Sequence, residues 1–155
     1  MTIKIISPGK TKMPFINEGI QLYLRRLKHY LPIEYSELKE NKSLPAAEAN
    51  RKLENDLLFK QIIPGDFVVL LDERGKNFSS AQFAGWMQQQ LNRNPKTITF
   101  IIGGAYGFEK ELQAKANAII SLSNLTFTHE MARMIFIEQL YRAMTILRNE
   151  KYHHL

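Results

Sequence analysis

Two apolar stretches decide the fold, Phe67-Val68-Val69-Leu70-Leu71 and Thr97-Ile98-Thr99-Phe100-Ile101-Ile102. Each has the length of a strand and is apolar over almost its whole length, as expected of a strand that is covered on both faces of a sheet. Between them, Ser79 precedes Gln82 by three residues, which is the spacing of a helix-capping box. Four apolar residues then recur at helical spacing: Phe83, Trp86, Met87 and Leu91. Residues 67–102 therefore predict a strand, a helix and a second strand.

The same alternation continues on both sides of this unit. Further strands are expected at residues 3–7, 33–38 and 118–122. Further helices are expected at residues 16–31, 53–62, 109–116 and 129–148. Repeated strand–helix units with short connections predict an α/β fold with a mostly parallel sheet flanked by helices. The length fits a single domain over residues 1–155.

The composition excludes several kinds of chemistry. The chain contains no cysteine, so it has no disulfide framework, Cys-ligated zinc, iron–sulfur cluster or thiol nucleophile. The longest apolar run, residues 67–71, is too short to span a bilayer, and residues 1–4 lack the apolar region of a signal peptide. We expect a soluble, cytoplasmic protein without a membrane-spanning segment.

The net charge of +6 is concentrated near the start of the chain. Residues 1–30 contain one acidic residue, Glu18, and six basic residues: Lys4, Lys10, Lys12, Arg25, Arg26 and Lys28. An excess of this kind fits a surface that faces the phosphates of a nucleic acid. It also fits a helix face that Lys and Arg keep in water, so charge alone leaves both interpretations open.

A ligand is expected at the ends of the predicted strands, because parallel sheets bind ligands outside the carboxyl ends of their strands. The segments concerned follow Leu71, Ile102 and Leu122. The glycines of Gly103-Gly104-x-x-Gly107 would let the backbone approach a ligand, or would simply form a tight turn. Their spacing is not a dinucleotide fingerprint, and the chain has no Gly-Lys-Ser/Thr phosphate loop. A nucleoside triphosphate is therefore disfavoured.

The segment from Leu122 to His129 alternates apolar residues with hydroxyl or amide residues. It could enclose a flat heterocycle, or pack as a loop on the core. His129 and Glu130 are similar to the start of a zinc-hydrolase helix, but Arg133 stands where the second imidazole is required, and a guanidinium does not bind zinc. We therefore expect no metal site, and His129 alone could bond locally at a helix start. The end, Tyr152-His153-His154, would suit stacking on a base or form an unstructured terminus.

These motifs together resemble the ribosomal RNA large subunit methyltransferase H family, from one end of the chain to the other and in the same order. The matching segments are residues 5–10, 71–76, 79–80, 100–107, 122–133 and 138–143. The resemblance implies a SPOUT-type fold with a C-terminal trefoil knot, and a homodimer with its site near the subunit interface. It implies S-adenosylmethionine as cofactor. It also implies methylation of N3 of a pseudouridine in the helix 69 loop of 23S rRNA in the ribosome.

The resemblance assigns the cofactor-binding residues by matching position, and the catalytic candidates are chosen for their proximity in sequence to the cofactor segment. Cofactor contacts are expected at the ends of three strands: Leu71, Gly103, Leu122, Ser123, Asn124, Leu125, Thr126 and Phe127. For catalysis we expect His129 as a base or orienting group, because N3 must lose its proton during the reaction. Four further residues are expected to position the nucleotide: Arg133, Arg142, Tyr152 and His153.

Two residues depart from the family pattern. Thr128 stands where the family usually has proline, and we expect it to cap the following helix so that the fold survives. His154 stands where the family usually has Arg or Lys, so a phosphate contact there would be weaker and more sensitive to pH. Two other functions stay open: a SPOUT methyltransferase that acts on tRNA, and a ribosome-binding module without enzymatic activity.

Overall fold

Five parallel strands form one sheet in the computed structural model, which describes residues 1–39, 47–104 and 107–154. The strands lie in the order β2-β1-β4-β3-β5, and every neighbouring pair runs parallel. Their bounds are β1 (Thr2–Pro8), β2 (Ile33–Leu38), β3 (Phe67–Asn77), β4 (Thr97–Ile102) and β5 (Ala118–Ser121). The predicted parallel α/β fold is therefore confirmed, while the C-terminal knot stays a prediction.

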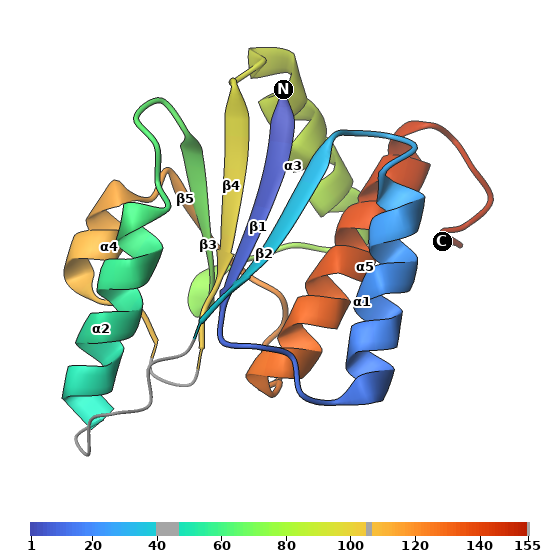
Figure 1. Cartoon of the computed structure of the whole chain (residues 1–155). Helices are drawn as coiled ribbons and strands as arrows, with labels where there is room; N and C mark the ends of the chain where they lie inside the picture. Colours follow the sequence, from blue (N-terminus) through green and yellow to red (C-terminus); the bar gives the residue numbers. More distant parts are fainter. Residues whose placement is uncertain (40–46, 105–106, 155) are drawn as a thin grey trace.

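Helices cover both faces of this sheet (Figure 1). On one face lie α1 (Pro14–Leu27), α3 (Ser80–Arg93) and α5 (His129–Leu147); on the other lie α2 (Ala47–Lys60) and α4 (Lys110–Lys115). Connections through α1 and α3 move the chain one way along the sheet, and those through α2 and α4 move it the other way. Opposite moves on opposite faces give the crossovers one hand, as βαβ units require. No helix in the described ranges is long and apolar enough to cross a membrane.

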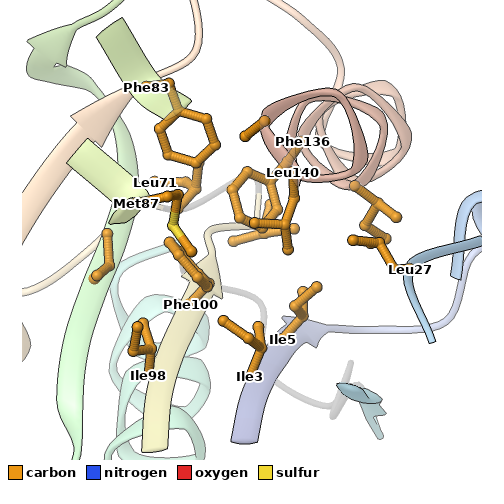
Figure 2. Close-up of a cluster of buried hydrophobic side chains, with 14 of the residues drawn as sticks. Ile3, Ile5, Leu27, Leu71, Phe83, Met87, Ile98, Phe100, Phe136 and Leu140 are labelled. Carbon is orange, nitrogen blue, oxygen red and sulfur yellow. The ribbon is translucent and has the colours of Figure 1, made fainter. Parts of the chain in front are cut away.

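The larger hydrophobic core lies between the sheet and the helices α1, α3 and α5. Figure 2 shows Phe100 of β4 beside Phe136 of α5, and their ring centroids are 4.8 Å apart. A smaller core under α2 and α4 contains Leu58, Leu70 and Leu112. Strands β3 and β4 supply side chains to both cores, which explains why their sequences lack polar alternation.

Strand β3 is longer than the sequence predicts, because it continues from Leu71 to Asn77. Leu71 and Lys76 both pair with Ile120 of β5, so residues 72–75 bulge out of the ladder. Gly75 allows the strand to return, since a Cβ atom there would lie 2.6 Å from a carbonyl carbon of β5. Most residues after the bulge are polar and exposed, and a hydrophobicity pattern therefore ends the strand too early.

Two helix caps that the sequence predicts are confirmed. Ser79 Oγ accepts a hydrogen bond from the Gln82 N–H, and Gln82 Oε1 accepts one from the Ser79 N–H, which completes the capping box of α3. Thr128 Oγ1 accepts a hydrogen bond from the N–H of Met131 at the start of α5. Threonine thus caps α5 at the position where the family usually has proline.

Candidate functional site

A cavity of about 660 Å³ opens at the bulge of β3 and at the carboxyl ends of β4 and β5. Its volume lies in the range of small-molecule sites. Its walls come from three segments that are far apart in the sequence: residues 71–74, residues 102–104 with 107–108, and residues between 121 and 132. Helices leave β3 and β4 toward opposite faces, so the cavity lies at a switch point of the sheet, where α/β folds bind ligands. The structure thus brings together the three segments expected from the strand ends.

The first wall is the bulge of β3. Arg74 Nε lies 3.0 Å from Asp72 Oδ1, and a second hydrogen bond joins Arg74 Nη2 to Asp72 Oδ2 at 3.1 Å. This pairing outweighs partial burial and holds the pKa of Asp72 below its usual value. The cavity edge therefore carries an ionised carboxylate, and Glu73 adds a second acidic side chain.

The second wall is the glycine-rich segment after β4. Gly103 has little room for a side chain, because a Cβ atom there would lie 3.0 Å from Cζ of Phe108, a buried ring of the same wall. Gly107 has a φ of +75°, which glycine adopts readily and other residues rarely adopt. Residues 105 and 106 of the predicted motif lie outside the described ranges. Glycine is therefore structurally required on both sides of them.

The third wall is the segment between β5 and α5. Ser121 Oγ donates to the Ser123 carbonyl, and Ser123 Oγ accepts from the Leu125 N–H, both at 3.0 Å, so the chain turns tightly there. Seven of the eight predicted cofactor contacts line the cavity: Leu71, Gly103, Leu122, Ser123, Leu125, Thr126 and Phe127. The eighth, Asn124, is not in the wall. Its Oδ1 accepts a hydrogen bond from Asn77 Nδ2 at 2.8 Å and so ties the segment to β3.

The first turn of α5 closes the cavity, with His129 and Ala132 in its wall. Next to His129, Glu130 Oε1 accepts hydrogen bonds from the backbone N–H groups of Lys12 (2.8 Å) and Met13 (3.0 Å). These bonds, the one from Met13 foremost, lower the pKa of Glu130 although burial opposes the shift. The carboxylate thereby holds the loop that precedes α1 beside the cavity.

Arg133, which the sequence predicts to position the nucleotide, is not in the cavity wall, and only 1% of its side chain is exposed. Its guanidinium donates to the carbonyls of Pro8 (2.5 Å) and Gly9 (2.9 Å) and to Glu37 Oε2 (3.0 Å). Burial alone would raise the pKa of Glu37. Hydrogen bonds from Thr11 and Tyr35, together with the charge of Arg133, outweigh burial and lower this pKa below its usual value. Arg133 therefore ties α5 to the ends of β1 and β2. Arg133 does not contact the cavity, and its contacts hold together the elements around it.

Arg142, Tyr152 and His153 form a separate group with Glu138, here named the tail cluster. Glu138 Oε1 accepts hydrogen bonds from Arg142 Nη2 at 2.6 Å and from the Tyr152 hydroxyl at 2.9 Å. Arg142 Nη1 lies 3.1 Å from His153 Nδ1, and its guanidinium lies 4.7 Å from the Tyr152 ring centroid. Burial and hydrogen bonds with Tyr23 and Glu138 raise the pKa of Tyr152, so its hydroxyl stays protonated. The C-terminal residues are thereby folded back onto α5.

The cavity and the tail cluster lie at different ends of α5. His129 begins the helix, and Arg142 follows thirteen residues later, which corresponds to about 20 Å along the helix axis. The structure therefore brings His129 to the predicted cofactor residues and keeps the other predicted catalytic residues away from them within one chain. The sequence pattern does not show which of these residues line the cavity, and the structure does.

The prediction from sequence omits several residues of the cavity wall: Asp72, Glu73, Arg74, Phe108 and Ala132. The first three belong to a motif that carries the family resemblance, and that motif is the signal that could have found them. Phe108 and Ala132 carry no comparable signal. Among the described residues, no cluster of three or more His, Asp or Glu side chains could hold a metal ion.

Comparison with known proteins defines the class. The sequence model of the family described as "Predicted SPOUT methyltransferase" matches residues 1–153. Similarity also extends over whole chains: the identity is 46% to a protein of Parabacteroides distasonis and 45% to one of Christiangramia forsetii, and each alignment covers 99% of both chains. The crystal structure of a probable methyltransferase from Bordetella pertussis has a similar fold, with a TM-score of 0.56, 13% identity, and coverage of 92% of this chain and 95% of that one.

The chain therefore belongs to the SPOUT methyltransferase family. This result agrees with the α/β sheet and with a ligand cavity at the strand ends. Within the class, the two bacterial relatives both carry the name Ribosomal RNA large subunit methyltransferase H. The resemblance predicted from the motifs is confirmed.

Proposed function

We propose that this protein uses S-adenosylmethionine to methylate 23S rRNA, and that its target is N3 of a pseudouridine in the helix 69 loop of assembled cytoplasmic ribosomes. The names of its relatives specify the RNA of the large ribosomal subunit. The pseudouridine target follows from the motif resemblance. The observation that carries the proposal is the convergence of Leu71, Gly103 and the segment before α5 on one cavity.

The cavity walls suit this methyl donor. Leu71, Phe108 and Phe127 offer apolar surface to an adenine ring, and the turn at Gly103 offers backbone groups at close range. Asp72 and Glu73 give the rim acidic side chains, which favour a ligand with a positive charge such as a sulfonium. When bound, the donor supplies an electrophilic methyl group.

The contribution of the protein would be placement and proton transfer. N3 of a pseudouridine is weakly acidic and loses its proton during methylation, so a group that accepts or stabilises charge is needed nearby. His129 is exposed in the cavity wall, and its imidazole can accept that proton or orient the base. Correct alignment of the two reacting groups is the main rate enhancement that a protein provides for such a transfer.

We further propose that a second copy of the chain completes the site. His129 and Arg142 of the tail cluster lie about 20 Å apart along α5 in one chain, so both would act on one nucleotide if a second subunit brings its own tail cluster to the cavity. Apolar side chains near the cavity are available for such a contact: Met13, Phe15 and Leu125 are 46%, 56% and 73% exposed. A symmetric dimer would contain two shared sites.

The basic N-terminal segment would bind RNA phosphates beyond the target base. Lys10, Arg25 and Arg26 are exposed, and Lys10 lies in the loop that Arg133 and Glu130 hold beside the cavity. Replacing Lys10 and Arg25 by Gln should weaken ribosome binding. It should also lower the slope of log K against log salt concentration by about 0.7–0.9 for each phosphate contact that is lost. An unchanged salt dependence would favour a solvated helix face.

Two measurements test the proposed function. Calorimetry should detect binding of S-adenosylmethionine to the wild-type protein, and mass spectrometry should detect N3 methylation in ribosomes that lack this modification. The His129→Ala variant should keep the binding and lose most of the methylation. Methylation of tRNA instead would identify the tRNA-directed alternative. No binding of the donor would favour a ribosome-binding module without enzymatic activity.

A further inference from the structure

Asn55 is a buried amide in α2, on the face of the sheet opposite α5, and only 4% of the residue is exposed. Two of its hydrogen bonds reach the glycine-rich segment: Nδ2 donates to the Gly107 carbonyl at 3.1 Å, and Oδ1 accepts from the Glu109 N–H at 2.8 Å. Nδ2 also donates to the Arg51 carbonyl, one turn earlier in α2. One amide group therefore connects α2 to the segment that forms the second cavity wall.

The segment that Asn55 holds is the part of the wall that leads into α4. Gly107 has no side chain, and Glu109, at the N-cap of α4, makes no side-chain capping bond. The N–H of this N-cap residue donates to Asn55 Oδ1. Arg51, from the same helix, lies 3.7 Å from Glu109 in an ion pair. Between these two anchored residues lies Phe108, whose ring lines the cavity.

A shift of this segment would reach further than Phe108 itself. The Phe108 ring lies so close to Gly103 that a Cβ atom on the glycine would be 3.0 Å from Cζ. Gly103 is one of the predicted cofactor contacts, and it shares the cavity wall with Gly107 and Phe108. Because buried side chains are closely packed, displacing one of these groups displaces the others. The hydrogen bonds of Asn55 to the residues on either side of Phe108 therefore bear on the position of this ring beside Gly103.

We propose that Asn55 is a positioning residue of the cofactor site, which fixes the wall formed by Gly103, Gly107 and Phe108 for S-adenosylmethionine. This inference rests on the proposed function, because that function names the ligand. Asn55 does not line the cavity and acts through the segment it bonds. Its two hydrogen bonds to the segment hold the wall in its binding geometry. Loss of both should therefore weaken the affinity for S-adenosylmethionine about tenfold.

The test compares Asn55→Leu with a matched control, Gln90→Leu. Gln90 is also a buried helical amide, 3% exposed, and its Nε2 donates to the Trp86 carbonyl one turn earlier, but it lies in α3 and outside the cavity wall. We expect Asn55→Leu to raise the Kd and KM for S-adenosylmethionine about tenfold at nearly unchanged kcat. Gln90→Leu should lower the thermal stability and leave both constants within about twofold.

Amide hydrogen exchange without any ligand gives a second readout. The Glu109 N–H should exchange faster in Asn55→Leu than in Gln90→Leu, because only the first variant removes its acceptor. Asn55→Asp keeps an acceptor for the Glu109 N–H and loses the donor to Gly107, so this N–H should exchange more slowly in it than in Asn55→Leu; it serves if the Leu variant does not fold. Unchanged affinity and exchange in the Asn55 variants would overturn the inference. If the wild type does not bind the donor, the proposed function fails, and the exchange data still decide the role of Asn55.

Discussion

The two ends of α5 present different chemistry. At the first turn, His129 lines a cavity with apolar side chains and free space for a ligand. Toward the other end, Arg142 is bonded to Glu138 and stacked on Tyr152, so this cation already has protein partners. The wall of this cavity contains Arg74, which is paired with Asp72, and it does not contain Arg142. The difference is what the proposed shared site requires: a second chain would bring its tail cluster to this cavity.

The largest effect is expected on stability, at Arg133. This residue lies on α5 between His129 and Arg142, and we expect its role to be structural. Arg133→Met should reduce the free energy of unfolding by about 3–5 kcal/mol, because Glu37 and two backbone carbonyls lose a buried donor. Urea unfolding measures the change. Arg142→Met, whose side chain is 24% exposed, is the control and should cost less, about 1–2 kcal/mol. Equal stability of both variants would contradict this structural role of Arg133.

The next effect concerns the tail cluster. Arg142→Met and Tyr152→Phe should each lower kcat for rRNA methylation by about a hundredfold, the usual range for a group that positions or assists a reacting base. The Kd for S-adenosylmethionine should not change, since neither residue lines the cavity. Single-turnover kinetics and calorimetry separate the two quantities. A parallel loss of donor affinity would mean that the two ends of α5 are not independent.

A smaller effect sharpens the description of the cavity end. Gly103→Ala places a methyl group 3.0 Å from Phe108 Cζ, so the wall must move and the affinity for the donor should fall about tenfold. Gly85→Ala is the matched control: nothing lies within 4 Å of its added Cβ, and α3 should gain up to about 1 kcal/mol in stability. Calorimetry and thermal unfolding of the pair check both statements. Similar donor affinities would show that the Gly103 wall does not touch the ligand.

The smallest effect is the pH dependence contributed by Glu130. Its folded pKa is lowered from 4.5, so its stabilisation is fully present above that pH and is lost as pH falls through the lowered value. Near neutral pH, the free energy of unfolding of the wild type should exceed that of Glu130→Gln by less than about 1 kcal/mol. This difference should disappear in acid, when the wild-type carboxylate is protonated. Thermal unfolding across the acid range measures it, and a gap that persists in acid would contradict the assignment.

Local patterns predict most of the strands, two helix caps and the place of the cavity well, because these depend on neighbouring residues. The apolar run at 67–71, the capping box at Ser79 and the cap at Thr128 each appear in the structure as expected. Long-range contacts are not encoded in such patterns. The return of β3 beyond its bulge at Gly75, the buried contacts of Arg133 with β1 and β2, and the link from Asn55 to Gly107 all join residues distant in sequence.

The same limit applies to the catalytic residues. His129 and Arg142 look like one group in the sequence, because both belong to α5 and its neighbourhood. Their spacing of thirteen residues on one helix corresponds to about 20 Å, and the structure shows that His129 lines the cavity and Arg142 does not. Sequence spacing on a long helix therefore reports which face residues share and does not place them in one site.

Mixing two inactive variants tests the shared site most directly. His129→Ala lacks the group at the cavity end, and Arg142→Met lacks the cation of the tail cluster. If each site combines His129 of one subunit with Arg142 of the other, random re-association of equal amounts should restore about one quarter of the wild-type rRNA methylation, since half the dimers are mixed and each holds one intact site. No recovery in a mixture shown to contain mixed dimers would contradict a site built from the two ends of α5.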